Sequence, residues 1–370
     1  MKNIFASRIG IIVVGAVIGA LAPLLQYLGN PKNMGICVAC FERDIAGAIG
    51  LHRADVVQYL RPEIMGFVLG SFLIAMATRE YKPRAGSSTV IRFFLGVFAM
   101  IGALVFLGCP WRALLRLAGG DGNAITGLLG LIAGITVGVL FLKNGYSLGR
   151  SYANKKAAGW VFPAFMLALF LFLVFNVSFS EGGPIFFSQK GPGSMHANMW
   201  VSLGAGLFIG GIAQKSRFCT MGALRDIILA RDIHLASGVL ALLIMAFLMN
   251  YFVFAQFNAG FESQPVAHTA HVWNFLGMTL AGLAFALAGG CPGRQLIMAG
   301  EGDADSGIFV LGMIVGAGLA HNFSLAAKPD AVVEEVYKIG GIGMYGQAAV
   351  IIGLIFCLII GFTMREKMQA

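Results

Sequence analysis

The sequence predicts an all-α membrane protein with many transmembrane helices, built from two related halves. Of its 370 residues, 58% are hydrophobic and only 12% are charged, and the mean hydropathy is +0.81. A soluble protein of this length needs a larger charged fraction to cover its surface, so the composition excludes one. Long apolar segments, and a set of cysteine motifs that occurs twice, complete the prediction.

Ten apolar segments recur along the chain. Each is about 17–22 residues long, which is enough to cross a bilayer core of roughly 30 Å. They are residues 8–28, 61–78, 90–108, 124–143, 159–179, 198–214, 234–255, 272–290, 306–323 and 345–363. The first follows a short basic start, but its apolar core is too long for a signal peptide, so we expect it to be the first span.

A segment rich in glycine, proline and serine separates the fifth apolar segment from the sixth. Such a composition is typical of a linker. We therefore predict a first membrane repeat at residues 1–180, an inter-repeat linker at 181–197 and a second membrane repeat at 198–370.

The two halves share motifs at a constant offset of 182 residues. Gly-Cys-Pro-x-Arg occurs at residues 108–112 and again at 290–294, and each copy closes a long apolar segment. The same offset superimposes Cys37 on Cys219, Cys109 on Cys291, Arg43-Asp44 on Arg225-Asp226, and Arg112 on Arg294. Chance would rarely match the cysteines and the Arg-Asp pair together in so apolar a chain. The sequence therefore predicts an internal repeat.

The two halves are expected to have opposite orientations in the membrane. Each carries five long segments, an odd number, so the second half starts from the other side. This is an inverted-topology repeat, the construction of many secondary transporters. With both termini in the cytoplasm, the basic residues of the loops collect mainly on the cytoplasmic side, as the positive-inside rule requires. That orientation accounts for the excess of Lys+Arg (26) over Asp+Glu (17), and we expect no nucleic acid partner.

Four short apolar pieces lie between the long segments. Residues 34–52 and 215–234 are helix-like but too short and too charged to cross, and residues 111–120 and 293–300 follow the two Cys-Pro sites. Non-helical backbone is tolerated at membrane depth where it lines a polar cavity. We therefore expect four short re-entrant helices that meet near the midplane. The alternative is amphipathic helices that lie on the membrane surface.

The four repeated cysteines, Cys37, Cys109, Cys219 and Cys291, are the candidate substrate path. Sulfur is polarisable, is a weak hydrogen-bond donor and acceptor, and as a thiolate attacks other sulfur or selenium atoms. Such thiols can pass a soft anion along a path or bind it as a mixed disulfide. The alternative is a small apolar packing residue, the role expected for Cys357.

Cys37 and Cys40 form a Cys-x-x-Cys motif and are a candidate redox pair. The offset of 182 places Gly222 opposite Cys40, so the second cysteine is not repeated. Packing or a passive disulfide are the alternatives. A membrane thiol–disulfide redox protein is therefore the rival function, although the sequence shows no quinone or haem motif to accept its electrons.

Arg112 and Arg294 each follow a repeated cysteine by three residues and are predicted to stabilise an anion. Proline after each cysteine breaks the preceding helix, and a new helix starting there directs free N–H groups toward the cysteine. The alternative for both arginines is snorkelling to the membrane interface. By contrast, Arg43–Asp44 and Arg225–Asp226 are predicted structural ion pairs, because opposite charges neutralise each other where water is scarce.

Other chemistry finds no support in the sequence. Cysteine, methionine and histidine do not cluster with convincing metal-ligand spacing. The chain also lacks a Walker motif, a dinucleotide fingerprint and a nucleophile elbow. We therefore predict no metal, no cofactor and no enzymatic activity.

The paired Gly-Cys-Pro-x-Arg sites and the matching Cys…Arg-Asp segments resemble the YeeE/YedE family of sulfur-compound transport proteins, over essentially the whole chain. Residues 29–66 are most similar to its YedE/FdhT branch, which is associated with selenium metabolism. The resemblance implies an hourglass of inverted repeats in which cysteines hand an anion through a narrow path. It assigns that role to Cys109 and Cys291, with Cys37 and Cys219 as further stations.

We therefore predict a permease of the bacterial cytoplasmic (inner) membrane, multi-pass and with both termini cytoplasmic. It would move a small selenium species or a thiosulfate-like anion. The expected partners are this substrate, membrane lipids and a cytoplasmic sulfur or selenium carrier protein. The rival is a redox protein that supports selenium metabolism and formate dehydrogenase.

Overall fold

A computed structural model describes residues 4–177, 179, 183–333 and 336–365. Within them the chain forms a bundle of α-helices with two very small antiparallel sheets. The long helices are α1 (Arg8–Tyr27), α3 (Pro62–Ala77), α4 (Thr89–Phe106), α6 (Asn123–Lys143), α7 (Lys156–Val174), α8 (Met199–Ser216), α10 (His234–Leu248), α11 (His271–Ala288), α13 (Ala304–Asn322) and α14 (Met344–Thr363). The short ones are α2 (Val38–Ala48), α5 (Pro110–Ala118), α9 (Thr220–Ala230) and α12 (Pro292–Gly300).

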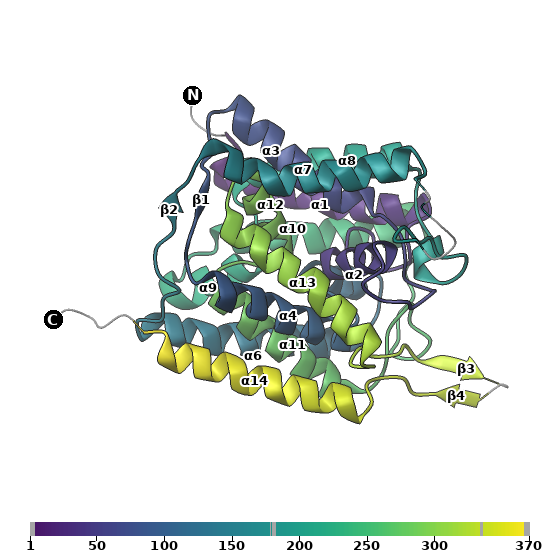
Figure 1. The fold of residues 1–370 in the computed structure, drawn as a ribbon. Coiled ribbons are helices and arrows are strands. Elements are labelled where there is room, and N and C mark those ends of the chain that lie inside the picture. Colours follow the sequence, from purple (N-terminus) through teal and green to yellow (C-terminus); the bar gives the residue numbers. More distant parts are fainter. Residues whose placement is uncertain (1–3, 178, 180–182, 334–335, 366–370) are drawn as a thin grey trace.

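The two ends of the bundle are marked by the two sheets (Figure 1). β1 (Arg84–Ala85) pairs with β2 (Tyr152–Ala153) at the end where α1 begins and α14 ends, here called the termini end. β3 (Ala331–Val333) pairs with β4 (Val336–Lys338) at the opposite end, the hairpin end. The long helices run between these two ends.

Each of the ten predicted apolar segments coincides with one long helix, and the ends agree within about five residues except in the segment 234–255, where α10 stops at Leu248 and a π-helix continues over Met249–Val253. In the described part of the chain, eight candidate spans are long and apolar enough to cross a membrane. The two predicted segments that fall short are α3, which has only 16 residues, and α8, whose last turn is the polar Gln214-Lys215-Ser216. By helix length and composition this is a multi-pass membrane protein.

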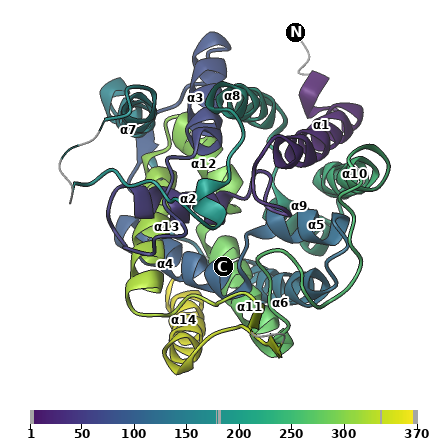
Figure 2. The same ribbon diagram turned by 90° about the vertical axis from the view of Figure 1, so that its right-hand side faces the viewer.

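The four predicted short helices also form, and they lie in the middle of the bundle, between the long helices (Figure 2). α5 and α12 each begin at the proline that follows a cysteine, because proline fits the first helical position but cannot continue the helix before it. α4 and α5 together make one 30-residue candidate span, Thr89–Ala118, and α11 and α12 make another, His271–Gly300. The Cys-Pro sites are therefore breaks within two long apolar stretches.

Both breaks have the same backbone geometry. The C-cap residue that follows α4 is Leu107, which has φ 64°, and the C-cap residue that follows α11 is Gly289, which has φ 86°. These positions differ by the offset of 182. Glycine adopts this left-handed conformation without strain, whereas leucine does so at a cost of roughly 1–3 kcal/mol. The first Cys-Pro site thus keeps a strained residue directly before its Gly-Cys pair.

Helices of the first half pack on helices of the second half through glycines. A Cβ on Gly130 of α6 would lie 2.1 Å from the Phe275 carbonyl oxygen of α11, and one on Gly312 of α13 would lie 2.1 Å from the Phe93 carbonyl oxygen of α4. The two contacts are related by the offset of 182. Small residues allow such backbone-to-backbone approach in membrane bundles. The two halves are therefore interlocked along their length.

The remaining close helix pairs follow the same pattern. α1 packs on α10, and a Cβ on Gly15 would lie 1.9 Å from the carbonyl oxygen of Gly238. α3 packs on α8, where a Cβ on Gly66 would lie 2.7 Å from the Cα of Gly206. Each pair joins one helix from each half. The predicted division at residues 181–197 thus separates two stretches of sequence that share one packed core.

Candidate functional site

The repeated cysteines form two close thiol pairs. Cys37 and Cys109 place their Sγ atoms 3.8 Å apart, and Cys219 and Cys291 place theirs 3.6 Å apart. All four side chains are buried. These distances allow S–H···S contacts, and no disulfide joins the sulfurs, since all six cysteines are free thiols. Each half of the chain thus contributes one thiol pair, called here the first pair and the second pair.

The pairs are built in the same way. Cys37 is the N-cap of α2 and accepts the Cys40 N–H at 3.4 Å, while Cys219 is the N-cap of α9 and accepts the Gly222 N–H at 3.2 Å. The partner thiol in each pair lies directly before α5 or α12. Two helix N-termini therefore converge on each pair, and their free N–H groups favour a bound anion.

The other two cysteines have different surroundings. Cys40 Sγ lies 3.8 Å from the Leu107 carbonyl oxygen and 3.5 Å from Arg112 Nη1, so it borders the first pair. Its role in a redox pair with Cys37 stays a prediction. Cys357 is buried within α14, a helix that contributes nothing to either thiol pair.

The two repeated arginines have unequal partners. Arg112 donates from Nε to the Asn33 carbonyl at 3.2 Å and from Nη2 to the Val266 carbonyl at 3.1 Å, and its Nη1 contacts the Leu107 carbonyl. Its guanidinium is therefore occupied in holding three chain segments around the first pair. Arg294 differs, because its Nη1 is buried and has no hydrogen-bond partner among the described residues. Of the two, Arg294 is the one with a donor free for an anion.

A cluster of charged side chains lies between the second pair and the termini end. Glu301 Oε2 lies 2.6 Å from Arg217 Nη1 and 3.6 Å from Arg294 Nη2, and Glu301 Oε1 lies 3.4 Å from Arg84 Nη1. Burial raises the pKa of the Glu301 carboxyl, but the three arginines outweigh it and hold that pKa below its ordinary value. Asp303 also lies 2.9 Å from Arg84 Nη2, so three guanidiniums face two carboxylates and this side of the second pair is net positive.

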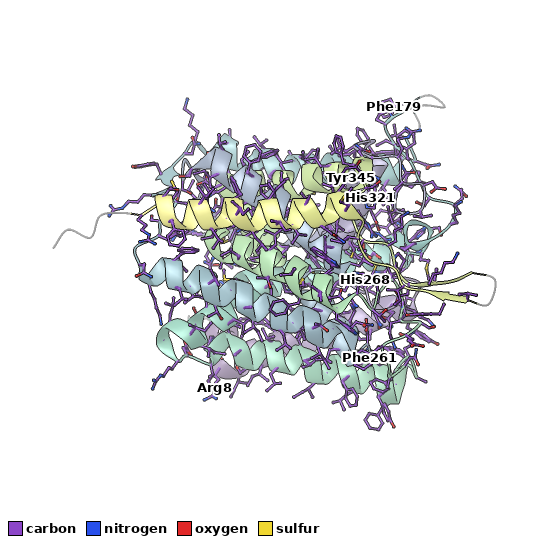
Figure 3. The ribbon with its side chains drawn as sticks, turned by 90° about the horizontal axis from the view of Figure 1, so that it is seen from below. Arg8, Phe179, Phe261, His268, His321 and Tyr345 are labelled. Carbon is purple, nitrogen blue, oxygen red and sulfur yellow. The ribbon has the colours of Figure 1, made fainter. Side chains whose placement is uncertain are left out.

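A cavity of about 500 Å³ lies at the hairpin end of the molecule. It is lined by residues that include Arg43, Leu104, Leu107, Val266 and His321. Figure 3 shows His321 on this side of the bundle, near β3 and β4. Because the cavity reaches Leu107, whose carbonyl oxygen is next to Cys40, it approaches the first pair from outside.

The predicted ion pairs differ in burial between the two halves. Asp44 is buried and contacts both Arg43 and Arg61, each at 2.7 Å. Its counterpart Asp226 lies 2.8 Å from Arg225, and the side chains of that pair are 25% and 35% exposed. Equivalent charges therefore sit in a dry site in the first half and near the surface in the second.

Comparison with known families bears on the second half. Residues 215–370 match the model of a family described as "Sulphur transport". The match covers less than half of the chain, but it contains the second thiol pair and Arg294. No curated protein matches the chain.

The sulphur transport match agrees with the kind of family that the sequence motifs resemble, and it points to a transporter rather than an enzyme. It says nothing of a selenium-associated branch, of thiosulfate or of a path of cysteines. Those finer assignments, and the roles of the individual site residues, stay predictions.

Three buried residues near the thiols were not predicted from the sequence. Arg61 joins Asp44 and has no counterpart, since the offset places Leu243 there. Both carboxylate oxygens of Glu42 on α2 are buried and lack a partner in the described part of the chain. Trp111 is buried next to Cys109. A signal for Trp111 was present, because it is a tryptophan where the otherwise matching second motif has a glycine.

Proposed function

We propose that this protein is a permease that moves a small sulfur- or selenium-containing anion across the bacterial cytoplasmic membrane, along a path formed by Cys37, Cys109, Cys219 and Cys291. The observation that carries the proposal is the presence of two buried thiol pairs, each at the meeting point of two helix N-termini. The sulphur transport match over the second half supports the substrate class.

The proposed path has a direction along it and ends at positive charge, which suits an anion. It would begin in the cavity at the hairpin end, pass the first pair and then the second pair, and leave through the positive cluster around Glu301. Thiols offer a polarisable anion weak contacts that are readily exchanged. The anion is thus held without the tight ligation that would stop its release.

We also propose that the halves are inverted-topology repeats and that the four short helices, α2, α5, α9 and α12, are re-entrant. In support, α4 starts beside β1 at the termini end, whereas its counterpart α11 starts beside residues 267–269, which bond Asp330 at the hairpin end. Equivalent helices therefore run in opposite directions. The repeats are residues 1–180 and 198–370, joined by the linker 181–197.

The termini end is proposed to face the cytoplasm. Its loops carry exposed basic side chains at Arg79, Lys82, Arg150 and Lys155, in keeping with the positive-inside rule. A cytoplasmic carrier protein for sulfur or selenium would then receive the substrate beside the Glu301 cluster, and lipids would surround the apolar outer helices.

This orientation predicts a specific labelling pattern. In a cysteine-free background, Lys82→Cys and Lys155→Cys should resist an impermeant maleimide on intact cells, because both would lie in the cytoplasm. Glu262→Cys, on an exposed hairpin-end loop, should react readily. Cell lysis should make all three reactive, which controls for local access. Strong labelling of either lysine position from outside would contradict the topology.

Uptake into proteoliposomes that contain only this protein tests the function itself. Radiolabelled thiosulfate, selenite and a selenide-generating mixture should be compared with empty liposomes. We expect saturable uptake of at least one of them. If none enters while a mixed disulfide with a partner protein can be trapped at Cys37 or Cys40, the redox function is the right one.

A further inference from the structure

Trp111 lies where the two halves meet at the centre of the molecule. It is the second residue of α5 and is 1% exposed. Its ring stands edge-on to Phe67 of α3 and to Phe218, with centroids 5.8 Å and 5.9 Å away. Phe218 directly precedes Cys219. The side chain that starts beside the first thiol pair therefore ends beside the second.

The ring is seated on the start of α12. A Cβ on Gly293 would lie 2.7 Å from Cζ2 of Trp111, and the next nearest ring atoms are Cε2 and Cη2. The benzo edge of the indole, centred on Cζ2, therefore packs on the start of α12, and the indole nitrogen is the next ring atom beyond Cε2. Trp111 and Gly293 are equivalent positions at the offset of 182. The centre thus holds one large ring against one glycine, and a second side chain would not fit.

The indole N–H has no partner. Nε1 is buried and makes no hydrogen bond to any described residue. Leaving a buried donor unpaired costs about 1–3 kcal/mol, and the great majority of buried polar atoms avoid it. Arg294 Nη1, on the residue after Gly293, is also buried and unpaired among the described residues. Two unused donors, one from each half, therefore belong to Trp111, which packs on the start of α12, and to Arg294, the third residue of that helix.

We propose that Trp111 is a substrate-binding residue, whose indole N–H donates a hydrogen bond to the anion as it passes from the first thiol pair to the second. The inference rests on the proposed function. The ring separates the two pairs, and the anion supplies the acceptor that the N–H otherwise lacks. An indole nitrogen can only donate, so its N–H selects a ligand with an acceptor atom, as every sulfur or selenium oxyanion has, and this N–H offers nothing to a metal cation.

Trp111→Phe tests the N–H, because phenylalanine keeps an aromatic ring there without the donor. A hydrogen bond to a charged group contributes about 1.5–3 kcal/mol, so KM for thiosulfate uptake by proteoliposomes should rise by about tenfold or more. Trp160→Phe, on the partly exposed outer face of α7, is the matched control and should keep the parental KM. A parental KM in Trp111→Phe would overturn the inference.

A second measurement leaves Trp111 unchanged. The chain has four tryptophans, so replacing Trp160, Trp200 and Trp273 by phenylalanine makes Trp111 the only one. Its emission should change saturably with thiosulfate and not with equal potassium chloride. An unchanged emission at thiosulfate concentrations that saturate uptake would overturn the inference and leave the proposed function standing. No uptake of any tested anion by the parental protein would overturn both.

Discussion

Cys109→Ser and Cys291→Ser should each reduce uptake per folded molecule by about tenfold or more, which corresponds to about 1.4 kcal/mol or more in binding along the path. Serine keeps the size of the side chain and a hydroxyl, but it removes the polarisable sulfur and the thiolate. Each substitution also removes one member of a thiol pair, the contact of 3.8 Å with Cys37 or that of 3.6 Å with Cys219. Radiolabelled uptake, normalised to folded protein, measures the effect.

The chain provides two matched controls for this experiment. Cys357→Ser replaces an equally buried thiol in α14, away from both pairs, and should leave uptake unchanged. Cys40→Ser should retain most uptake, because Cys40 only borders the first pair. Complete loss in Cys40→Ser would favour the redox function. A double variant of Cys109 and Cys291 that folds and transports at the parental rate would exclude the cysteine path.

Asp44→Asn should destabilise the protein by about 3–5 kcal/mol, the usual cost of removing one partner from a buried ion pair. Asp44 is the carboxylate between Arg43 and Arg61, and all three side chains are buried. Its loss would leave two positive charges without compensation in the interior. The midpoint of thermal unfolding in detergent, or an unfolding titration, measures the change in stability.

The repeat supplies the control for this prediction as well. Asp226→Asn alters the equivalent residue, but its pair with Arg225 is partly exposed, and exposed pairs contribute about 0–1 kcal/mol. The two substitutions are chemically identical, so the difference between them reports the burial of Asp44 together with its second arginine, Arg61, which Asp226 lacks. Equal losses of stability at both positions would contradict this account.

The sequence predicted the helices well because their signals are local. Apolar length marked the long helices, and proline after cysteine marked the starts of α5 and α12. The constant offset identified the four repeated cysteines, but it did not predict which of them pair; in the structure each pair joins two cysteines of the same half, 72 residues apart. The sequence could not predict which helices and side chains lie next to one another in the folded protein. Each thiol contacts a partner from its own half, and Trp111 of α5 contacts Gly293 of α12.

The sequence also could not predict how the surroundings of equivalent residues differ between the two repeats. Arg112 and Arg294 are the same residue in the same motif, but among the described residues only Arg112 is surrounded by carbonyl oxygens, which come from segments near residues 33, 107 and 266. Those partners are far apart along the chain and carry no side-chain signal, because a backbone carbonyl belongs to every residue. Burial of Asp44 and exposure of Asp226 likewise depend on which helices cover them.

The glycine contacts that join α6 to α11 and α4 to α13 restrict the movement of one half of the protein relative to the other. At Gly130 and Gly312 the helix backbones touch without intervening side chains, so one half cannot rock against the other without losing both contacts together. A solute would then cross a stationary framework, and only small parts such as thiol rotamers and the Trp111 ring would need to move. If the proposed cysteine path operates, the rate of transport would then be set by how quickly the solute exchanges between neighbouring sulfurs, and the surrounding lipid would not be reshaped in each cycle.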